Sequence, residues 1–166
     1  MTPHTLESIH SDILVAKAIL YSKEGLNEIP YLINQAAYHC AQAIEKSLKA
    51  IINNGGKLTN ELRNTHNIDA LMLKAEVCRE GIIREYPLIA ENSEVLSQFN
   101  ALRYCGKGIT KNDTIKLYKQ ARDLYQDLLS EFLKEHPDKK RYFAKSVREY
   151  DALEKLRLSK PTVYRD

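Results

Sequence analysis

The stretch YLINQAAYHCAQAIEKSLKAII, residues 31–52, constrains the fold more than any other part of the chain. On a helix of 3.6 residues per turn its apolar side chains gather on one side and its polar side chains on the other. The apolar side holds Ile33, Ala36, Ala37, Cys40, Ile44, Leu48 and Ile51. The polar side holds Tyr38, Gln42, Glu45 and Lys49, flanked by Gln35, His39 and Lys46. A long amphipathic helix of this kind predicts a fold built by packing helices together.

The polar side of this helix has two interpretations. In the first it is solvated, and Glu45 forms an ion pair with Lys49, which lies four residues later in the favourable order. In the second, the tyrosine, histidine, glutamine, glutamate and lysine side chains line a groove or a contact between subunits. The sequence pattern by itself favours the first interpretation, whereas the adjacent tyrosine and histidine support the second, because a face that only meets water rarely needs both.

The rest of the chain reads as further helices separated by glycine and proline. The expected helices cover residues 3–23, 29–54, 88–104 and 110–135, and a further helix begins at residue 65 or 66 and lies before the break at Pro87. A polar loop runs up to residue 64, and a weaker helix is expected at about 141–158. Thr110 and Asp113 have the spacing of a capping box at the start of the fifth helix. Short loops between long helices favour antiparallel neighbours. We therefore predict an all-α, up-and-down bundle of about five helices with a C-terminal helical or extended tail.

Buried apolar positions follow from the same periodicity. We expect core positions at Leu6, Ile9, Ile13, Ala16 and Leu20 in the first helix, Ile68, Leu71, Met72, Ala75 and Cys78 in the third, Leu88, Val95, Phe99 and Leu102 in the fourth, and Tyr118, Ala121, Tyr125, Leu128 and Phe132 in the fifth. A chain of 166 residues is long enough for one domain with a real core.

Composition excludes several classes of protein. No apolar run approaches the roughly 20 residues that cross a bilayer, and the N-terminus lacks a basic start followed by an apolar block. We expect a cytoplasmic protein without a membrane contact. Cys40, Cys78 and Cys105 are odd in number and widely spaced, which suits free thiols rather than disulfides. The histidines show no metal-ligand spacing, so we expect neither a metal nor a cofactor.

Charge divides the chain unevenly. Residues 137–166 hold nine Lys or Arg and five Asp or Glu, whereas the other 136 residues hold 16 basic and 17 acidic side chains. We therefore divide the chain into a nearly neutral bundle, residues 1–136, and a basic extension, residues 137–166. A basic extension of this kind is either a solvated end or a contact for nucleic acid or an acidic partner.

Four strings in register resemble the HEPN domain family, and the last of them, KNDTIKLYKQARDLYQDLL, is similar to its last helix. The string AYHCAQAIEKSLKAII is similar to the second HEPN helix, with matches at Tyr38, His39, Gln42, Glu45, Lys46, Lys49 and Ala50. THNIDALM resembles the segment that opens the third helix, and matches it at Thr65 and His66. FNALRYCGKGIT resembles the end of the fourth helix, with matches at Asn100, Arg103 and Tyr104. The resemblance covers about residues 6–133.

The resemblance implies a five-helix domain that usually forms a dimer. Such domains occur as ribonucleases, as partners of minimal nucleotidyltransferases in toxin–antitoxin pairs, and as non-catalytic nucleotide-binding or scaffold modules. The ribonucleases carry an arginine followed four to six residues later by a histidine. This chain departs from that motif, since Arg103 has no histidine in reach, Arg122 precedes His136 by fourteen positions, and Arg63 precedes His66 by three.

The candidate site residues follow from these strings. We predict a polar, phosphate-binding pocket formed by Tyr38, His39, Gln42, Lys46, His66, Arg103 and Tyr104. The alternative is structural: Glu45, Lys49 and Arg103 form a buried ion network, and His66 lies in the first turn of the third helix and bonds a loop carbonyl. If the protein cuts RNA, His66 or His39 with Arg103 would supply the proton transfer and the cation.

The expected function is therefore that of a non-catalytic module. We expect a homodimer that binds a nucleotide, RNA or a nucleotidyltransferase-type protein partner. One alternative is a metal-independent ribonuclease with an atypical site, which would cut RNA without added metal. The other is a structural dimerisation scaffold, which would bind no ligand and contact itself through the polar side of the second helix.

Overall fold

The computed structural model describes residues 1–98 and 109–143, and every regular element among them is helical. The elements are α1 (Pro3–Leu20), η1 (Leu26–Glu28), α2 (Pro30–Asn54), α3 (Asn60–Asn64), α4 (Ile68–Cys78), α5 (Ile82–Glu85), α6 (Pro87–Glu91), α7 (Ser93–Ser97), α8 (Lys111–Glu135) and η3 (Pro137–Lys139). The predicted all-α class is confirmed. The chain separates into two compact units, residues 1–129 and 130–166.

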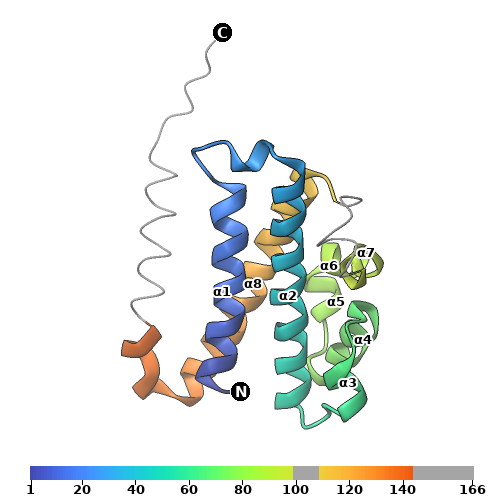
Figure 1. Ribbon diagram of the computed structural model, residues 1–166. Coiled ribbons are helices and arrows are strands. Elements are labelled where there is room, and N and C mark those ends of the chain that lie inside the picture. The colour runs from blue at the N-terminus through green and yellow to red at the C-terminus, as the bar shows by residue number, and fades with distance from the viewer. Residues whose placement is uncertain (99–108, 144–166) are drawn as a thin grey trace. The chain divides into compact units, whose positions relative to one another are not determined.

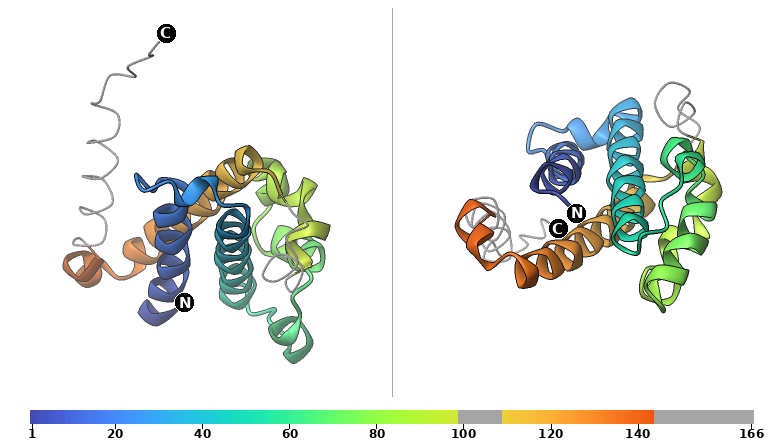
Figure 2. Two further views of the ribbon diagram at one scale, coloured as in Figure 1. Left: turned by 45° about the horizontal axis from the view of Figure 1, so that its top comes forward. Right: turned by 90° about the horizontal axis from the view of Figure 1, so that it is seen from below.

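The first unit is built around α2. Figure 1 shows α1 rising and α2 returning beside it, with α3 to α7 on the other side of α2. The views in Figure 2 show the same order. Helix α8 crosses behind α1, where Tyr125 stacks on His10 at 5.3 Å and Tyr118 meets Tyr21 edge to face at 5.6 Å, measured between ring centroids. α2 therefore has neighbours on more than one side.

Burial along α2 corrects the first interpretation of its polar side. No residue from Leu32 to Ile52 is exposed. All seven predicted apolar positions are buried, and so are Asn34, Glu45 and Ser47. The polar side is therefore not a solvated face, because α1 and the α3–α7 group cover it. A helix without an exposed residue over this length pairs most of its polar side chains within the protein.

Helix α1 matches its predicted core but ends earlier than predicted. Its five predicted core residues are all buried, and Thr2 caps it by accepting a hydrogen bond from the Thr5 amide at 3.2 Å. It ends at Leu20 rather than at residue 23. Gly25, expected to end this helix, instead precedes η1 with a φ of 78°, which glycine adopts readily.

The segment between α2 and α8 differs most from the prediction. The polar loop contains a short helix, α3, which Thr59 caps through the Leu62 amide at 3.2 Å. Helix α4 begins at Ile68 and is capped by Asn67, so His66 lies before the helix and not in its first turn. Asn67 is the N-cap residue because its side-chain oxygen accepts a hydrogen bond from the Ala70 amide.

The predicted fourth helix is not continuous. Residues 82–97 form three short helices, α5 to α7, which are broken at Tyr86 and Asn92. The breaks change the buried phase: Ile89 and Leu96 are buried, whereas Leu88 and Val95 are only half-buried. Phe99 and Leu102 lie outside the described residues.

Helix α8 follows the prediction closely. Thr110 Oγ1 accepts the Asp113 amide at 3.2 Å and donates to the Asp113 carboxylate at 2.7 Å. All five predicted core residues are buried. In the second unit the Phe132 ring contacts the rings of His136 at 4.5 Å and Phe143 at 5.9 Å. Of the predicted helix at 141–158, only residues 141–143 are described, and they are helical.

Candidate functional site

His39 and Lys46 meet a carboxylate of α1. They lie seven residues apart on α2, which places them on one face, and both contact Asp12. Asp12 Oδ1 lies 2.8 Å from His39 Nδ1, and Lys46 Nζ donates to Asp12 Oδ2 at 2.6 Å. Lys46 also donates to Ser8 Oγ at 2.9 Å. We name Ser8, Asp12, His39 and Lys46 the Asp12 cluster; it joins α1 to α2.

The electrostatics of Asp12 reflect this arrangement. Burial raises the pKa of Asp12, but the hydrogen bonds from His39 and Lys46 outweigh it and hold the pKa below its ordinary value of 3.8. Asp12 is therefore a carboxylate at neutral pH and accepts both hydrogen bonds. The same carboxylate and burial raise the pKa of the Cys40 thiol far above its usual range, burial being the larger cause. Cys40 is an unreactive core residue.

Glu45 forms a second cluster on another face of α2. Lys49 Nζ donates to Glu45 Oε1 at 2.8 Å, and His66 Nδ1 lies 2.9 Å from Glu45 Oε2. Lys49 also donates to the Arg63 carbonyl oxygen at 2.8 Å. We name Glu45, Lys49 and His66 the Glu45 cluster. It fixes the connection before α4 to α2, and His66 bonds this carboxylate rather than the predicted loop carbonyl.

The two histidines of the predicted pocket are thus held by different acids. Each carboxylate also accepts a hydrogen bond from a lysine, and a histidine Nδ1 that bonds a carboxylate is the donor. Nε2 is left as the outer nitrogen of each ring. The His66 side chain is 57% exposed, whereas that of His39 is 24% exposed. His66 therefore presents its ring to solvent far more than His39 does.

The other predicted pocket residues are less well defined by their contacts. The Tyr38 ring lies edge to face against the His39 ring at 5.1 Å. The Gln42 amide nitrogen is buried and has no hydrogen-bond partner. Arg103 and Tyr104 lie outside the described residues, so the structure does not test their part in a phosphate pocket or an ion network.

Sequence reasoning missed Asp12, the acid that organises the first cluster. Ser8 and Asp12 are four residues apart and lie next to Ile9 and Ile13 of the buried stripe of α1. Side chains four residues apart lie on one face of a helix, so Ser8 and Asp12 border the buried stripe together. This position next to the buried stripe could have identified Asp12 as a residue that contacts another helix, but it does not indicate which side chains Asp12 contacts.

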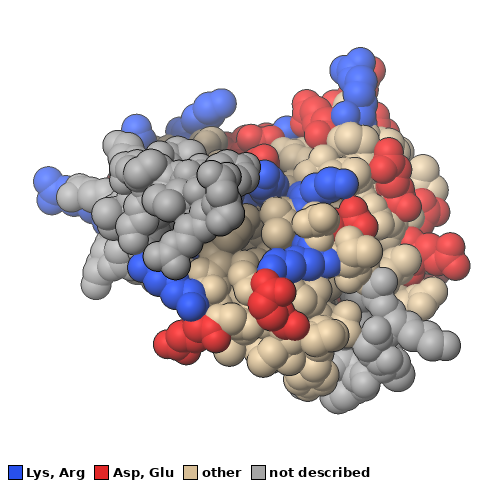
Figure 3. Space-filling view, turned by 90° about the horizontal axis from the view of Figure 1, so that it is seen from above, with Lys and Arg blue, Asp and Glu red and all other residues tan. Residues whose placement is uncertain are grey.

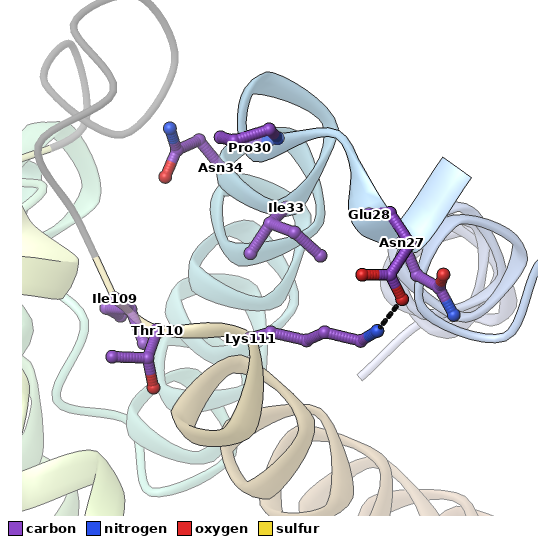
Figure 4. A pocket seen from close by; sticks show the side chains of 8 residues that line it. All are labelled: Asn27, Glu28, Pro30, Ile33, Asn34, Ile109, Thr110 and Lys111. Carbon is purple, nitrogen blue, oxygen red and sulfur yellow. Dashed lines mark hydrogen bonds and ion pairs between the residues drawn. The ribbon is translucent and has the colours of Figure 1, made fainter. Parts of the chain in front are cut away.

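A cavity of about 330 Å³ lies between the amino ends of α2 and α8. Figure 4 shows it bordered by Asn27 and Glu28 on one side, by the first turns of α2 above, and by residues 109–111 below. The Lys111 side chain runs beneath Ile33 to reach the Glu28 carboxylate, with which it pairs at 2.5 Å. Sequence reasoning did not single out this cavity.

Charge on the end of the bundle seen from above is mixed. Figure 3 shows Lys and Arg side chains next to Asp and Glu side chains, with uncharged residues between them. Among the described residues there is no group of three or more acidic, histidine and cysteine side chains able to hold a metal ion. None of the described helices combines the length and apolar character needed to cross a membrane.

Comparisons with known proteins do not assign a family. No family model matches the chain, and neither the curated proteins nor the solved structures contain a match.

Proposed function

We propose that the chain is a HEPN-like, non-catalytic module that forms a dimer and binds a nucleotide or a nucleotidyltransferase-type partner. One observation carries the non-catalytic part. His39 and His66, the two histidines that the sequence offers as catalytic candidates, contact Asp12 and Glu45 of the same chain, and the neighbouring Lys46 and Lys49 pair with the same two carboxylates. Cations neutralised in this way stabilise the bundle and are poorly placed to bind the phosphate of RNA.

The missing ribonuclease motif supports the same conclusion. No histidine follows Arg103 at a spacing of four to six residues. The nucleotide or partner side of the proposal comes from the resemblance of residues 31–52 to the second HEPN helix.

The test combines ligand binding with RNA cleavage. The melting temperature of the full chain is measured with ATP, GTP, AMP and a short RNA at millimolar concentration, and RNA integrity is followed in EDTA. A ligand that binds only the folded state raises the melting temperature as its concentration rises. We expect such a rise without cleavage, and a dimer by light scattering. A monomer unaffected by all four ligands contradicts the proposal.

A second candidate, the metal-independent ribonuclease, is favoured by one contact. Glu45 holds Nδ1 of His66, whose side chain is 57% exposed, so the ring is oriented at the surface of the bundle. In this interpretation His66 takes the proton of an RNA 2′-hydroxyl as that oxygen bonds to the neighbouring phosphorus, and the 5′-oxygen leaves with a proton from solvent, which gives a 2′,3′-cyclic phosphate. Cleavage in EDTA that His66→Gln abolishes and His39→Gln leaves unchanged would replace the first proposal with this one.

A further inference from the structure

Helix α4 has one exposed apolar stripe. Leu73 and Val77 lie four residues apart, so they share one face of the helix, and they are 57% and 63% exposed. Val77 is the most exposed large apolar residue of the described chain. The opposite face of α4 is buried through Leu71 and Ala75, and Figures 1 and 2 place the helix on the side of α2 away from α1. Exposed apolar side chains that adjoin one another, unlike scattered ones, indicate a contact surface.

The two ends of this stripe carry opposite charges. Asp69 is exposed and lies four residues before Leu73, on the same face. Lys57 is also exposed, and its Nζ lies 3.5 Å from the Val77 carbonyl oxygen, which places the ammonium group at the carboxyl end of α4. Neither Asp69 nor Lys57 forms an ion pair with another residue of the described chain. The stripe therefore runs from an acid, through two apolar side chains, to a base.

The acids near the carboxyl end of α4 do not neutralise this base. The two carboxylate oxygens of Glu76 accept hydrogen bonds from the amides of Gly81 and Ile83, at 2.7 and 3.0 Å. That carboxylate is therefore directed at the start of α5. Glu80 lies beyond the last turn of α4. Lys57 is thus the charge that this end of the helix presents next to the stripe.

A second copy of α4 fits this stripe in the antiparallel direction. A two-fold axis beside Leu73 brings each Leu73 against its counterpart, as in an isologous interface. Asp69 and Val77 are each four residues from Leu73, about 6 Å along the helix axis in opposite directions. The same axis therefore places Asp69 of one copy beside Val77 of the other, where the second copy's Lys57 lies. Parallel packing would instead place like charges together.

We infer that a second copy of this chain binds to α4, with the two α4 helices antiparallel and related by a two-fold axis. This inference rests on the proposed function, for whose dimer it supplies the interface. Leu73 forms the centre of the contact, and two pairs of Asp69 with Lys57 fix its direction. Two large apolar side chains per copy are few beside the roughly 20 residues that a standard interface engages on each side. We therefore expect a weak dimer whose population depends on protein concentration.

Sedimentation velocity of the full chain over a series of concentrations tests the inference. Leu73→Asp places two carboxylates against each other at the two-fold axis, and should weaken self-association at least about tenfold. Leu14→Asp is the matched control, because Leu14 is also an exposed leucine, 42% exposed, but lies on α1. It should change the dissociation constant of the dimer by less than about twofold.

A charge exchange tests the antiparallel direction. Asp69→Lys places two lysines beside each other at both ends of the contact, and Lys57→Glu places two acids there. Each single variant should weaken self-association at least about tenfold. The double variant restores opposite charges across the axis, so its dissociation constant should lie within about threefold of that of the wild type. Thermal melts of every variant confirm that it is folded.

The outcomes separate this inference from the proposed function. A dimer that Leu73→Asp leaves intact, or that Leu14→Asp weakens equally, overturns the α4 contact and leaves the dimeric module standing. A double charge variant that associates as weakly as the single variants also overturns it, because the antiparallel pairing is then absent. A chain that stays monomeric up to about 1 mM loses both the α4 contact and the dimer of the proposed function.

Discussion

The Asp12 and Glu45 clusters have the same composition but different surroundings. Each places one carboxylate between a lysine and a histidine, at distances of 2.6–2.9 Å. Asp12 joins two long helices, and its histidine is mostly enclosed. Glu45 joins α2 to a connection, and its histidine is mostly in solvent. The same three residue types therefore join packed helices at Asp12, whereas at Glu45 they hold an exposed imidazole ring at the surface.

The difference teaches that a pair of this type does not by itself identify a catalytic site. What decides is whether the outer nitrogen of the histidine can reach a substrate. The Asp12 cluster, with its mostly enclosed histidine, meets this criterion less well than the Glu45 cluster, whose histidine ring is mostly in solvent.

Removal of the acid in the Asp12 cluster should have the largest effect. Asp12→Ala leaves a partly buried lysine and histidine without their shared acceptor, and should lower the free energy of unfolding by about 3 kcal/mol. Urea denaturation at pH 7 measures this. Asp123→Ala is the matched control, since that carboxylate is half-exposed and its pair is with the neighbouring Arg122. It should lower the free energy by less than about 0.5 kcal/mol. Equal losses would show that the Asp12 cluster has no special role.

Substitution of the two histidines sharpens the comparison. His39→Gln should lower the free energy of unfolding by about 1.5 kcal/mol, because an enclosed hydrogen bond to a charged group is lost. His66→Gln should lower the free energy of unfolding by about 0.5 kcal/mol, because the His66 ring is exposed and water weakens its bond to Glu45. The same urea titrations compare them. A larger loss at His66 would reverse the assignment of structural and displayed roles.

Acid should remove the contribution of Asp12 to stability. Its pKa is lower in the folded chain than its ordinary value of 3.8, so the folded state binds this proton less readily than the unfolded state does. The contribution is complete above 3.8 and is lost as the pH falls through the folded pKa. The stability gap between the wild type and Asp12→Asn should therefore stay constant from pH 7 down to the ordinary pKa of 3.8 and narrow as the pH falls below it toward the folded pKa. A gap independent of pH would contradict the lowered pKa.

The smallest effect is expected at the ion pair beside the cavity. Lys111→Met should change the free energy of unfolding by less than about 0.5 kcal/mol, since Glu28 is largely exposed. Thermal melts without ligand measure this. A loss of unfolding free energy comparable to that of Asp12→Ala would show that the Lys111–Glu28 pair stabilises the fold as strongly as the clusters do.

The sequence predicted those features that depend on periodicity. The cores of α1, α2 and α8 followed from apolar spacing, and the start of α8 followed from Thr110 and Asp113. The region 57–97 was less predictable, because Thr59, Asn67, Tyr86-Pro87 and Asn92 break it into elements of at most eleven residues. Over such short lengths caps and tertiary contacts outweigh periodicity.

The candidate site was only partly predictable for a similar reason. The Glu45–Lys49 contact lies within one helix, where spacing alone fixes the distance. The partners of His39, Lys46 and His66 come from elements 21 to 38 residues away, and a single sequence does not indicate which side chains these contacts join. The cavity depends on where two helix ends meet, which periodicity does not specify.

The position of α2 between α1 and the α3–α7 group affects the hydrogen exchange of its backbone amides. Its backbone amides from Leu32 to Ile52 have no route to solvent through fraying of a single neighbour, because α1 and the α3–α7 group would both have to detach. Their hydrogen exchange should thus report unfolding of the whole first unit, whereas short helices such as α3 exchange through local opening. Among the described residues, we therefore expect the slowest hydrogen exchange at the amides of α2.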